Sequence, residues 1–98
     1  MWITKIWLKG LDNKKIKSLQ EKCEDILKKD PTFKFKILQY DEKSKKYTGF
    51  DKTKKGGDCY LMVFSSSKDK SHRRGVWLIN KIDELKGKGY NVEFKEKI

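Results

Sequence analysis

Two segments of this sequence space their apolar residues three or four positions apart, as an amphipathic helix does. The first begins after Asp12, a predicted N-cap, and ends at Asp30-Pro31; the second begins at Ser67 or Ser71 and ends at Gly87. Each segment has a single apolar stripe, formed by Ile16, Leu19, Cys23, Ile26 and Leu27 in the first and by Leu78, Ile79, Ile82 and Leu85 in the second. Each helix therefore has one side to bury against another element.

Four other segments have the alternation or the short apolar run of a strand, namely residues 2–9, 33–40, 59–64 and 90–97. The order along the chain is therefore β-α-β-β-α-β. This order predicts a single α+β domain over residues 1–98, in which two helices cover one face of a four-stranded antiparallel sheet in the ferredoxin-like arrangement. Right-handed crossovers place the first and third strands at its centre. We expect residues 41–58 to form a long loop or an extended hairpin tip.

Trp7 lies on the polar side of the first predicted strand. Ile6 and Leu8 alternate with it and belong to the face that the helices cover, so Trp7 is expected on the open face together with Lys5 and Lys9. The second predicted strand adds Lys34, Lys36 and Tyr40 to the same face. The alternative is that Trp7 packs under the loop 41–58 or against a partner subunit.

The segment IWLKGL, residues 6–11, resembles the hexamer motif on the first strand of RNA recognition motif domains. In that family the second residue of the motif stacks on a base, and here that residue is Trp7. The octamer motif of the third strand corresponds to GDCYLMVF, residues 57–64, with agreement at Phe64. This alignment places Cys59 and Leu61 at the stacking positions, whereas a slip of one residue or a bulge would expose Tyr60 and Met62 instead. The resemblance implies RNA or single-stranded DNA as the ligand.

The chain has 25 lysines and arginines against 14 acidic residues, for a net charge of +11. Such an excess favours a polyanionic partner, most often nucleic acid. The alternative is a lysine-rich surface without a specific ligand. The predicted nucleic-acid-binding residues are cations and aromatics of the open face and of the basic loop 41–58, namely Lys5, Trp7, Lys9, Lys34, Lys36, Tyr40, Lys45, Lys46 and Tyr47.

The loop 41–58 has two interpretations. In it Tyr47 and Phe50 are surrounded by lysines, namely Lys43, Lys45, Lys46, Lys52, Lys54 and Lys55. It is either a basic finger that closes on a nucleic-acid strand or a solvated hairpin tip whose aromatics fold back on the sheet. Four acidic residues in the same stretch partly cancel its charge.

The second predicted helix supports a different function. Trp77 lies opposite the apolar stripe, and an exposed tryptophan among cations is a candidate anchor for a protein partner. The alternative function is therefore a protein-binding adaptor or inhibitor, of viral or mobile-element origin, that acts through Arg73, Arg74, Trp77 and Lys81. If the helix starts late or tilts, Trp77 would instead be buried at its edge.

No residue pattern indicates catalysis or a cofactor. His72 is the only histidine, and no nucleophile or carboxylate partner is evident beside it. Cys23 and Cys59 are too few for a metal site and are expected to be buried free thiols, which fits a reducing compartment. No segment has the length and hydropathy of a membrane span. We therefore expect a cytoplasmic binding protein rather than an enzyme, with no membrane partner.

Overall fold

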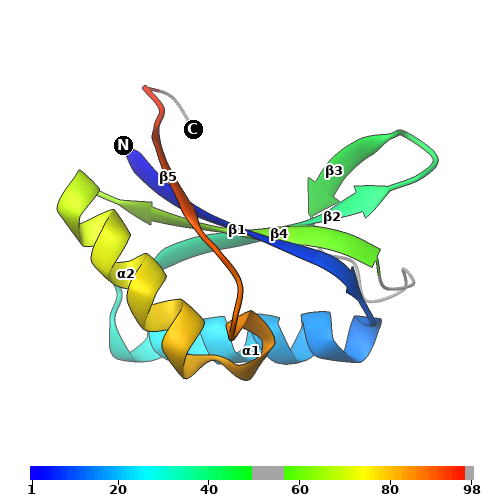
Figure 1. Cartoon of the computed structure of the whole chain (residues 1–98), viewed down its shortest axis with the longest axis horizontal. Helices are drawn as coiled ribbons and strands as arrows, with labels where there is room; N and C mark the ends of the chain where they lie inside the picture. Colours follow the sequence, from blue (N-terminus) through cyan, green and yellow to red (C-terminus); the bar gives the residue numbers. More distant parts are fainter. Residues whose placement is uncertain (50–56, 97–98) are drawn as a thin grey trace.

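The computed structural model describes residues 1–49 and 57–96. Its elements follow one another as β1 (Trp2–Leu11), α1 (Asn13–Lys29), β2 (Lys34–Asp41), β3 (Lys46–Gly49), β4 (Gly57–Ser65), α2 (Lys68–Lys81), the 3-10 turn η1 (Asp83–Leu85) and β5 (Asn91–Phe94). The strands form one antiparallel sheet in the order β3-β2-β4-β1-β5. Both helices lie on the same face of this sheet (Figure 1). The α+β class and the two helices on one face are therefore confirmed.

The sheet has one strand more than predicted. β3 lies within the predicted loop 41–58 and pairs with β2, so that Tyr47 faces Tyr40 across the two strands. The turn between them is closed by Asp41, whose carboxylate accepts hydrogen bonds from the Lys43 amide and the Ser44 hydroxyl. Lys45 completes the turn with φ 56°. The start of this segment is thus an extended hairpin; Phe50, Lys52, Lys54 and Lys55 lie outside the described residues.

The core lies between the helices and the sheet. Both helical stripes contribute to it, through Ile16, Leu19 and Cys23 of α1 and Leu78 of α2. β4 supplies Cys59, Leu61 and Val63 from the centre of the sheet, and β1 supplies Ile6 and Leu8. A smaller cluster of Ile3, Met62 and Phe64 is buried among these same two central strands but separate from the main core.

The helix starts are fixed by side chains, as the sequence predicted. The Asp12 carboxylate accepts a hydrogen bond from the Lys15 amide, and the Ser67 hydroxyl accepts one from the Lys70 amide. Of the two serines considered for the second helix, Ser67 is therefore the cap. Ser71 is buried within α2 and bonds to the Thr4 hydroxyl of β1 at 2.6 Å, which joins the helix to the sheet.

The second helix and the last strand are shorter than predicted. α2 ends at Lys81, because Ile82 adopts an extended conformation and the chain continues into η1. Ile82 and Leu85 are nevertheless buried, so the apolar spacing indicated burial correctly but not the helix end. The last strand spans Asn91–Phe94 instead of residues 90–97. Tyr90 precedes it and packs on the main core beside Gly75.

Candidate nucleic-acid interface

The face of the sheet that the helices leave uncovered begins with β1. Ile6 and Leu8 are buried in the main core, and Trp7, which alternates with them, is 43% exposed. The predicted orientation of Trp7 away from the helical layer is therefore confirmed. The pairing of β1 with β4 places Tyr60 directly opposite Trp7 and Met62 opposite Lys5.

The orientation of β4 distinguishes between the two alignments of the octamer motif. Cys59 and Leu61 are fully buried in the main core, so the direct alignment puts the stacking positions on the wrong face. Tyr60 and Met62 belong to the open face instead. The reason is the pairing register, since Cys59 faces the buried Leu8 across the strands and Tyr60 faces the exposed Trp7. Met62 is only 8% exposed and Tyr60 is half-buried, however, so the exposure expected of the alignment slipped by one residue is met only in part.

Four rings on the open face touch one another, and we call Trp7, Tyr40, Tyr47 and Tyr60 the aromatic patch. The ring centroids of Trp7 and Tyr60 are 4.6 Å apart, and Tyr47 lies 4.9 Å from Tyr60 and 5.5 Å from Trp7. Tyr40 extends the patch, with its ring 5.4 Å from that of Tyr47. The hairpin β2–β3 thus brings a ring next to Trp7 that is forty residues away in sequence. Tilted and edge-on contacts of this kind hold the rings in place.

Lys5 is the cation closest to the aromatic patch. Its ammonium nitrogen lies 4.8 Å from the centroid of the Trp7 ring and 4.5 Å from that of Tyr60. Both distances are within the range of cation–π attraction. The same nitrogen is 3.9 Å from a carboxylate oxygen of Glu93 on β5, a long ion pair. Lys5 is therefore held at the edge of the patch by two rings and one carboxylate.

Lys34 and Lys36 on β2 lie on the same side of the aromatic patch as Lys5. Lys36 and Lys5 are both opposite Met62 on β4, one from each neighbouring strand, and Lys34 is opposite Phe64. Both β2 lysines are exposed. The structure thus places Lys5, Lys34 and Lys36 on one side of the aromatic patch, toward the end of the sheet where β1 begins.

Three predicted lysines are not brought to this surface. Lys46 is opposite Asp41 and alternates with Tyr47, so it belongs to the other face of the hairpin. Lys45 lies in the turn before β3, beyond the patch. Lys9 falls in the register shift between Leu8 and Leu11, where the alternation of β1 is interrupted. All three are exposed, but the structure does not group them with the rings.

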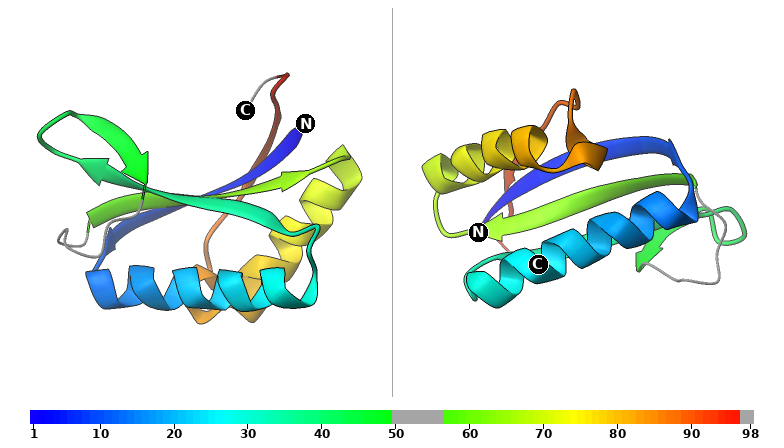
Figure 2. Two further views of the ribbon diagram at one scale, coloured as in Figure 1. Left: turned by 180° about the vertical axis from the view of Figure 1, so that it is seen from behind. Right: turned by 90° about the horizontal axis from the view of Figure 1, so that it is seen from below.

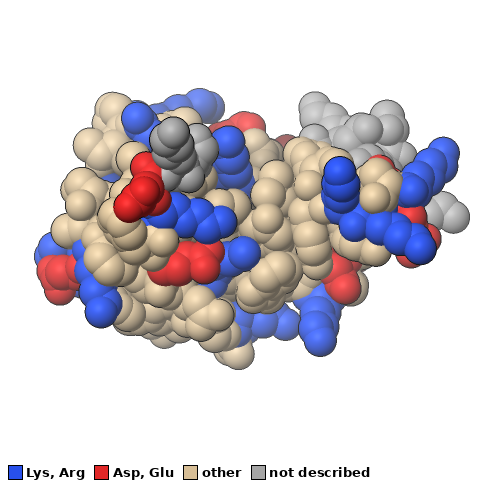
Figure 3. Space-filling model, turned by 90° about the horizontal axis from the view of Figure 1, so that it is seen from above, with Lys and Arg blue, Asp and Glu red and all other residues tan. Residues whose placement is uncertain are grey.

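The charges on the open face lie around an uncharged band. Figure 3, which looks down on this face, shows lysines toward both ends of the molecule and uncharged surface between them. Some carboxylates lie among these lysines (Figure 3). Lysines therefore flank uncharged surface on this face, and the Lys5 ammonium lies over two rings of the aromatic patch.

The hydroxyls of Tyr47 and Tyr60 remain neutral. Burial raises the pKa of Tyr60 and of Tyr47 above the ordinary value for tyrosine, and nearby carboxylates add to the effect, that of Asp58 for Tyr47 and that of Glu93 for Tyr60. Both phenols are therefore protonated at neutral and mildly alkaline pH. These two residues therefore add rings and hydrogen-bonding hydroxyls to the patch without adding negative charge.

The predicted protein-binding residues lie on α2, which packs on the covered face of the sheet. Trp77 is 44% exposed, so its predicted exposure is confirmed. Arg73 and Lys81 are exposed too, and Arg73 pairs with Asp69 at 3.1 Å. Arg74 differs, because its side chain is only 12% exposed and its guanidinium donates to the Phe64 carbonyl oxygen at 3.2 Å. Arg74 therefore fixes α2 to β4.

Metal binding has no visible basis in the part of the chain that the structure describes. No group of three or more His, Cys, Asp or Glu side chains comes together within residues 1–49 and 57–96. Cys23 and Cys59 are both free and buried, as predicted. Nδ1 of His72 lies 3.3 Å from the Tyr90 hydroxyl, which occupies it in a structural contact.

Comparison with known proteins identifies no relative. No family model, curated protein or solved structure matches this chain. No described helix is long and apolar enough to cross a membrane.

Proposed function

We propose that this chain binds single-stranded nucleic acid, RNA or DNA, on the open face of its sheet. The observation that carries the proposal is the aromatic patch, in which one ring from each of β1, β2, β3 and β4 joins a continuous surface. Two of these rings, Trp7 and Tyr40, are exposed, and apolar surface that is exposed in this way marks a candidate interaction site. Bases are suitable partners because each has an apolar face of similar size to these rings.

The rings and the lysines have separate roles in this proposal. Stacking of a base on an aromatic side chain contributes roughly 1–3 kcal/mol, and Trp7 and Tyr40 are the most exposed rings of the patch. Tyr47 and Tyr60 hold these two rings in position through their mutual contacts. Phosphates then lie toward Lys5, Lys34 and Lys36, where each contact releases counterions and makes binding dependent on salt.

The proposal includes a fold relationship. Without β3, the sheet order is β2-β4-β1-β5 with two helices on one face, which is the order expected of a ferredoxin-like domain. In this interpretation β1 and β4 are the strands that carry the hexamer and octamer motifs of an RNA recognition motif. Trp7 is then the stacking residue of the hexamer motif, Tyr60 is paired with it across the strands and supports its ring, and β3 is an addition at the edge.

A titration of labelled single-stranded oligonucleotides, followed by fluorescence anisotropy at several salt concentrations, tests the function. Trp7→Ala is expected to weaken binding by roughly 1–3 kcal/mol at every salt concentration. Lys36→Ala is expected to weaken binding and to reduce the slope of log affinity against log salt by about one phosphate contact. Lys88→Ala is the matched control, because Lys88 is an equally exposed lysine in the turn after η1 and is expected to change the slope little.

Two results contradict the proposal. One is the absence of binding by the wild-type protein at low salt. The other is equal weakening by Lys36→Ala and Lys88→Ala with no effect of Trp7→Ala, which is the behaviour of a diffuse positive charge. Circular dichroism on each variant verifies that lost binding does not reflect lost folding.

A further inference from the structure

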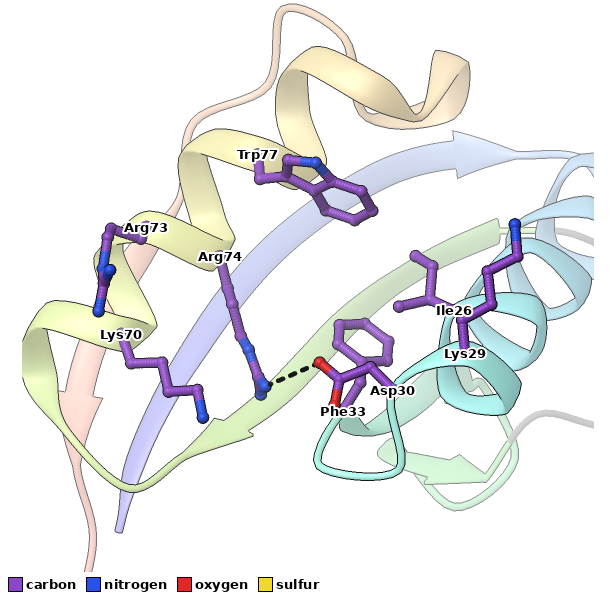
Figure 4. A pocket seen from close by; sticks show the side chains of 8 residues that line it. All are labelled: Ile26, Lys29, Asp30, Phe33, Lys70, Arg73, Arg74 and Trp77. Carbon is purple, nitrogen blue, oxygen red and sulfur yellow. Dashed lines mark ion pairs between the residues drawn. The ribbon is translucent and has the colours of Figure 1, made fainter.

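A groove of about 590 Å³ lies on the opposite side of the molecule from the aromatic patch. It runs between the end of α1, the start of β2 and the outer side of α2, and eight residues line it: Ile26, Lys29, Asp30, Phe33, Lys70, Arg73, Arg74 and Trp77. Both helices lie on the same side of the sheet (Figure 2), and the lining residues come from both of them and from the segment between α1 and β2. Figure 4 shows the lining side chains from close by.

One wall of the groove is rigid. The Arg74 guanidinium donates to the Thr32 hydroxyl at 2.9 Å and lies 3.6 Å from the Asp30 carboxylate. Its Cζ atom also lies 5.6 Å from the centroid of the Phe33 ring. With the bond to the Phe64 carbonyl oxygen, these contacts occupy the guanidinium from several directions. Arg74 is therefore part of the frame of the groove and offers little to a ligand.

The groove has an apolar interior. The Trp77 indole extends from α2 over the space toward α1, with Ile26 on the far side and Phe33 at the base (Figure 4). Trp77 is 44% exposed although it has apolar neighbours within reach. A ring held open over an apolar cavity is typical of a pocket that receives an anchor side chain.

The rim of the groove is positive. The lining residues include four cations and one carboxylate, and that carboxylate, Asp30, is already paired with Arg74. Hydrogen bonds from Thr32 hold the pKa of Asp30 below its ordinary value, and the charges of Arg74 and Lys70 lower it further. Lys29 and Lys70 form no salt bridge within residues 1–49 and 57–96. They remain available to pair with negative groups that a ligand brings.

From this combination we infer a second binding site, in which the groove docks an acidic protein segment through one apolar or aromatic anchor side chain. The anchor lies between Trp77, Ile26 and Phe33, and carboxylates beside it in sequence pair with Lys29 and Lys70. Charge complementarity supports this occupant, as does the apolar interior. The site is independent of nucleic-acid binding, because it uses the helical side of the molecule and the aromatic patch uses the open face of the sheet (Figure 1).

A nucleotide fits the same groove less well. Its base would have to bury a polar edge against Ile26, Phe33 and Trp77. The Arg74 guanidinium, whose side chain is 12% exposed, is already bonded to Thr32 and Phe64. Buried polar groups that are left unpaired cost free energy. A leucine or phenylalanine side chain carries no such cost, which favours a peptide anchor.

Three fluorescein-labelled peptides of equal length test the inference by anisotropy: one of Glu, Leu and Phe, one with Lys in place of Glu, and one with Ser in place of Leu and Phe. The first is expected to bind, and the other two to bind at least about tenfold more weakly. Trp77→Ala and Lys70→Glu are each expected to reduce binding of the first peptide by about tenfold or more. Lys88→Glu, the same charge change away from the groove, is expected to leave binding nearly unchanged.

The variants are chosen to remain folded. Trp77 is exposed, so its truncation is expected to change the melting temperature little. Lys70 is the residue whose amide bonds to the Ser67 cap, and a glutamate at this third helical position completes a capping box. Lys70→Glu is therefore expected to preserve α2 or stabilise it. A large drop in stability with Trp77→Ala would show that Trp77 is core and would overturn the inference.

The remaining outcomes separate the two sites. Equal binding of the acidic and basic peptides, or equal weakening by Lys88→Glu and Lys70→Glu, overturns the inference. So does displacement of the acidic peptide by an unlabelled single-stranded oligonucleotide, because the groove would then be a nucleic-acid site. Trp7→Ala is expected to leave peptide binding unchanged, so peptide binding can succeed even if nucleic-acid binding fails.

Discussion

The close approach of α2 to the segment before β5 predicts an unusual response to a mild substitution. Gly75 is buried, and a Cβ atom at this position would lie 2.7 Å from Cδ2 and 2.9 Å from Cε2 of the Tyr90 ring. Carbon atoms in good contact are about 3.5–4.0 Å apart. Tyr90 packs on the main core, so its ring has little room to withdraw. Gly75→Ala therefore requires α2 or Tyr90 to move.

The net effect of Gly75→Ala is a difference between two opposing contributions. Overpacking typically costs about 1–3 kcal/mol of unfolding free energy. Alanine in place of glycine inside a helix gains about 1 kcal/mol. We therefore expect Gly75→Ala to destabilise the wild-type protein by up to about 2 kcal/mol, where helix propensity alone predicts stabilisation.

A double-mutant cycle in urea separates these contributions. In the background of Tyr90→Ala the ring is absent, so Gly75→Ala is expected to stabilise the protein by about 1 kcal/mol. The sign of the effect thus reverses with the identity of residue 90. If Gly75→Ala stabilises both backgrounds equally, the close packing described for Gly75 is wrong.

Two further predictions concern ionisable groups in the body of the fold. Burial raises the pKa of Glu84, but it is outweighed by the sum of hydrogen bonds from Lys22 at 2.8 and 3.0 Å, from the backbone and from Ser18, together with the charge of Lys22, so that the folded-state pKa is below the ordinary value. The ionised Glu84 carboxylate stabilises the folded state at neutral pH, and this stabilisation is lost as pH falls through the folded-state pKa. Glu84→Gln is therefore expected to lower the free energy of unfolding, measured in urea, by about 1–2 kcal/mol at neutral pH and by much less in strong acid. Burial also raises the pKa of Cys23 to about 12 and that of Cys59 to about 11. Both thiols are therefore expected to react with a thiol reagent at mildly alkaline pH only as fast as the protein unfolds, and fast labelling in the absence of urea would contradict their burial.

Local sequence patterns were sufficient to predict most elements of the fold. The apolar stripes of the helices were sufficient to locate α1 and α2, because burial on one side imposes a spacing that a single sequence displays. The Asp12 cap was recognisable for the same reason, since its partner is the Lys15 amide three residues away. The hairpin strand β3 was considered only as a hairpin tip, because four residues with one aromatic give little periodicity. Its pairing depends on the Asp41 turn and on contact between Tyr40 and Tyr47.

The candidate site was predicted in part. Trp7 was placed correctly because it alternates with the apolar residues Ile6 and Leu8, both of which are buried. Tyr60 was only one of two possibilities, because the unbroken apolar run of β4 does not reveal which residues face the helices. The pairing of β4 with β1 determines that Tyr60 faces away from the helices. This pairing joins residues that are far apart in sequence, so a local pattern does not predict it. Lys46 was predicted to lie with the rings only because the segment 41–58 is rich in lysine. In β3 it alternates with Tyr47, so the two side chains belong to opposite faces of the hairpin.

The groove could not be predicted from the sequence. Arg73 and Trp77 were recognisable on α2 as an exposed aromatic among cations. Their opposite wall, with Ile26 and Lys29, comes from α1, and nothing in the pattern of either helix gives the space between them. That space depends on how each helix packs on the sheet. For α2 this position depends on the close approach of Gly75 to Tyr90 and on the hydrogen bond from Arg74 to the Phe64 carbonyl oxygen.

The proposal of nucleic-acid binding is tested most directly by the three tryptophan indole N–H signals in a two-dimensional NMR spectrum of the ¹⁵N-labelled protein. Trp7 lies on the open face, Trp77 at the groove, and Trp2 beside Phe94 of β5. Addition of a single-stranded oligonucleotide at low salt is expected to shift or broaden the Trp7 signal, with the Trp77 signal unchanged. If no indole signal changes, or if the Trp77 signal changes while that of Trp7 does not, the proposed interface is wrong.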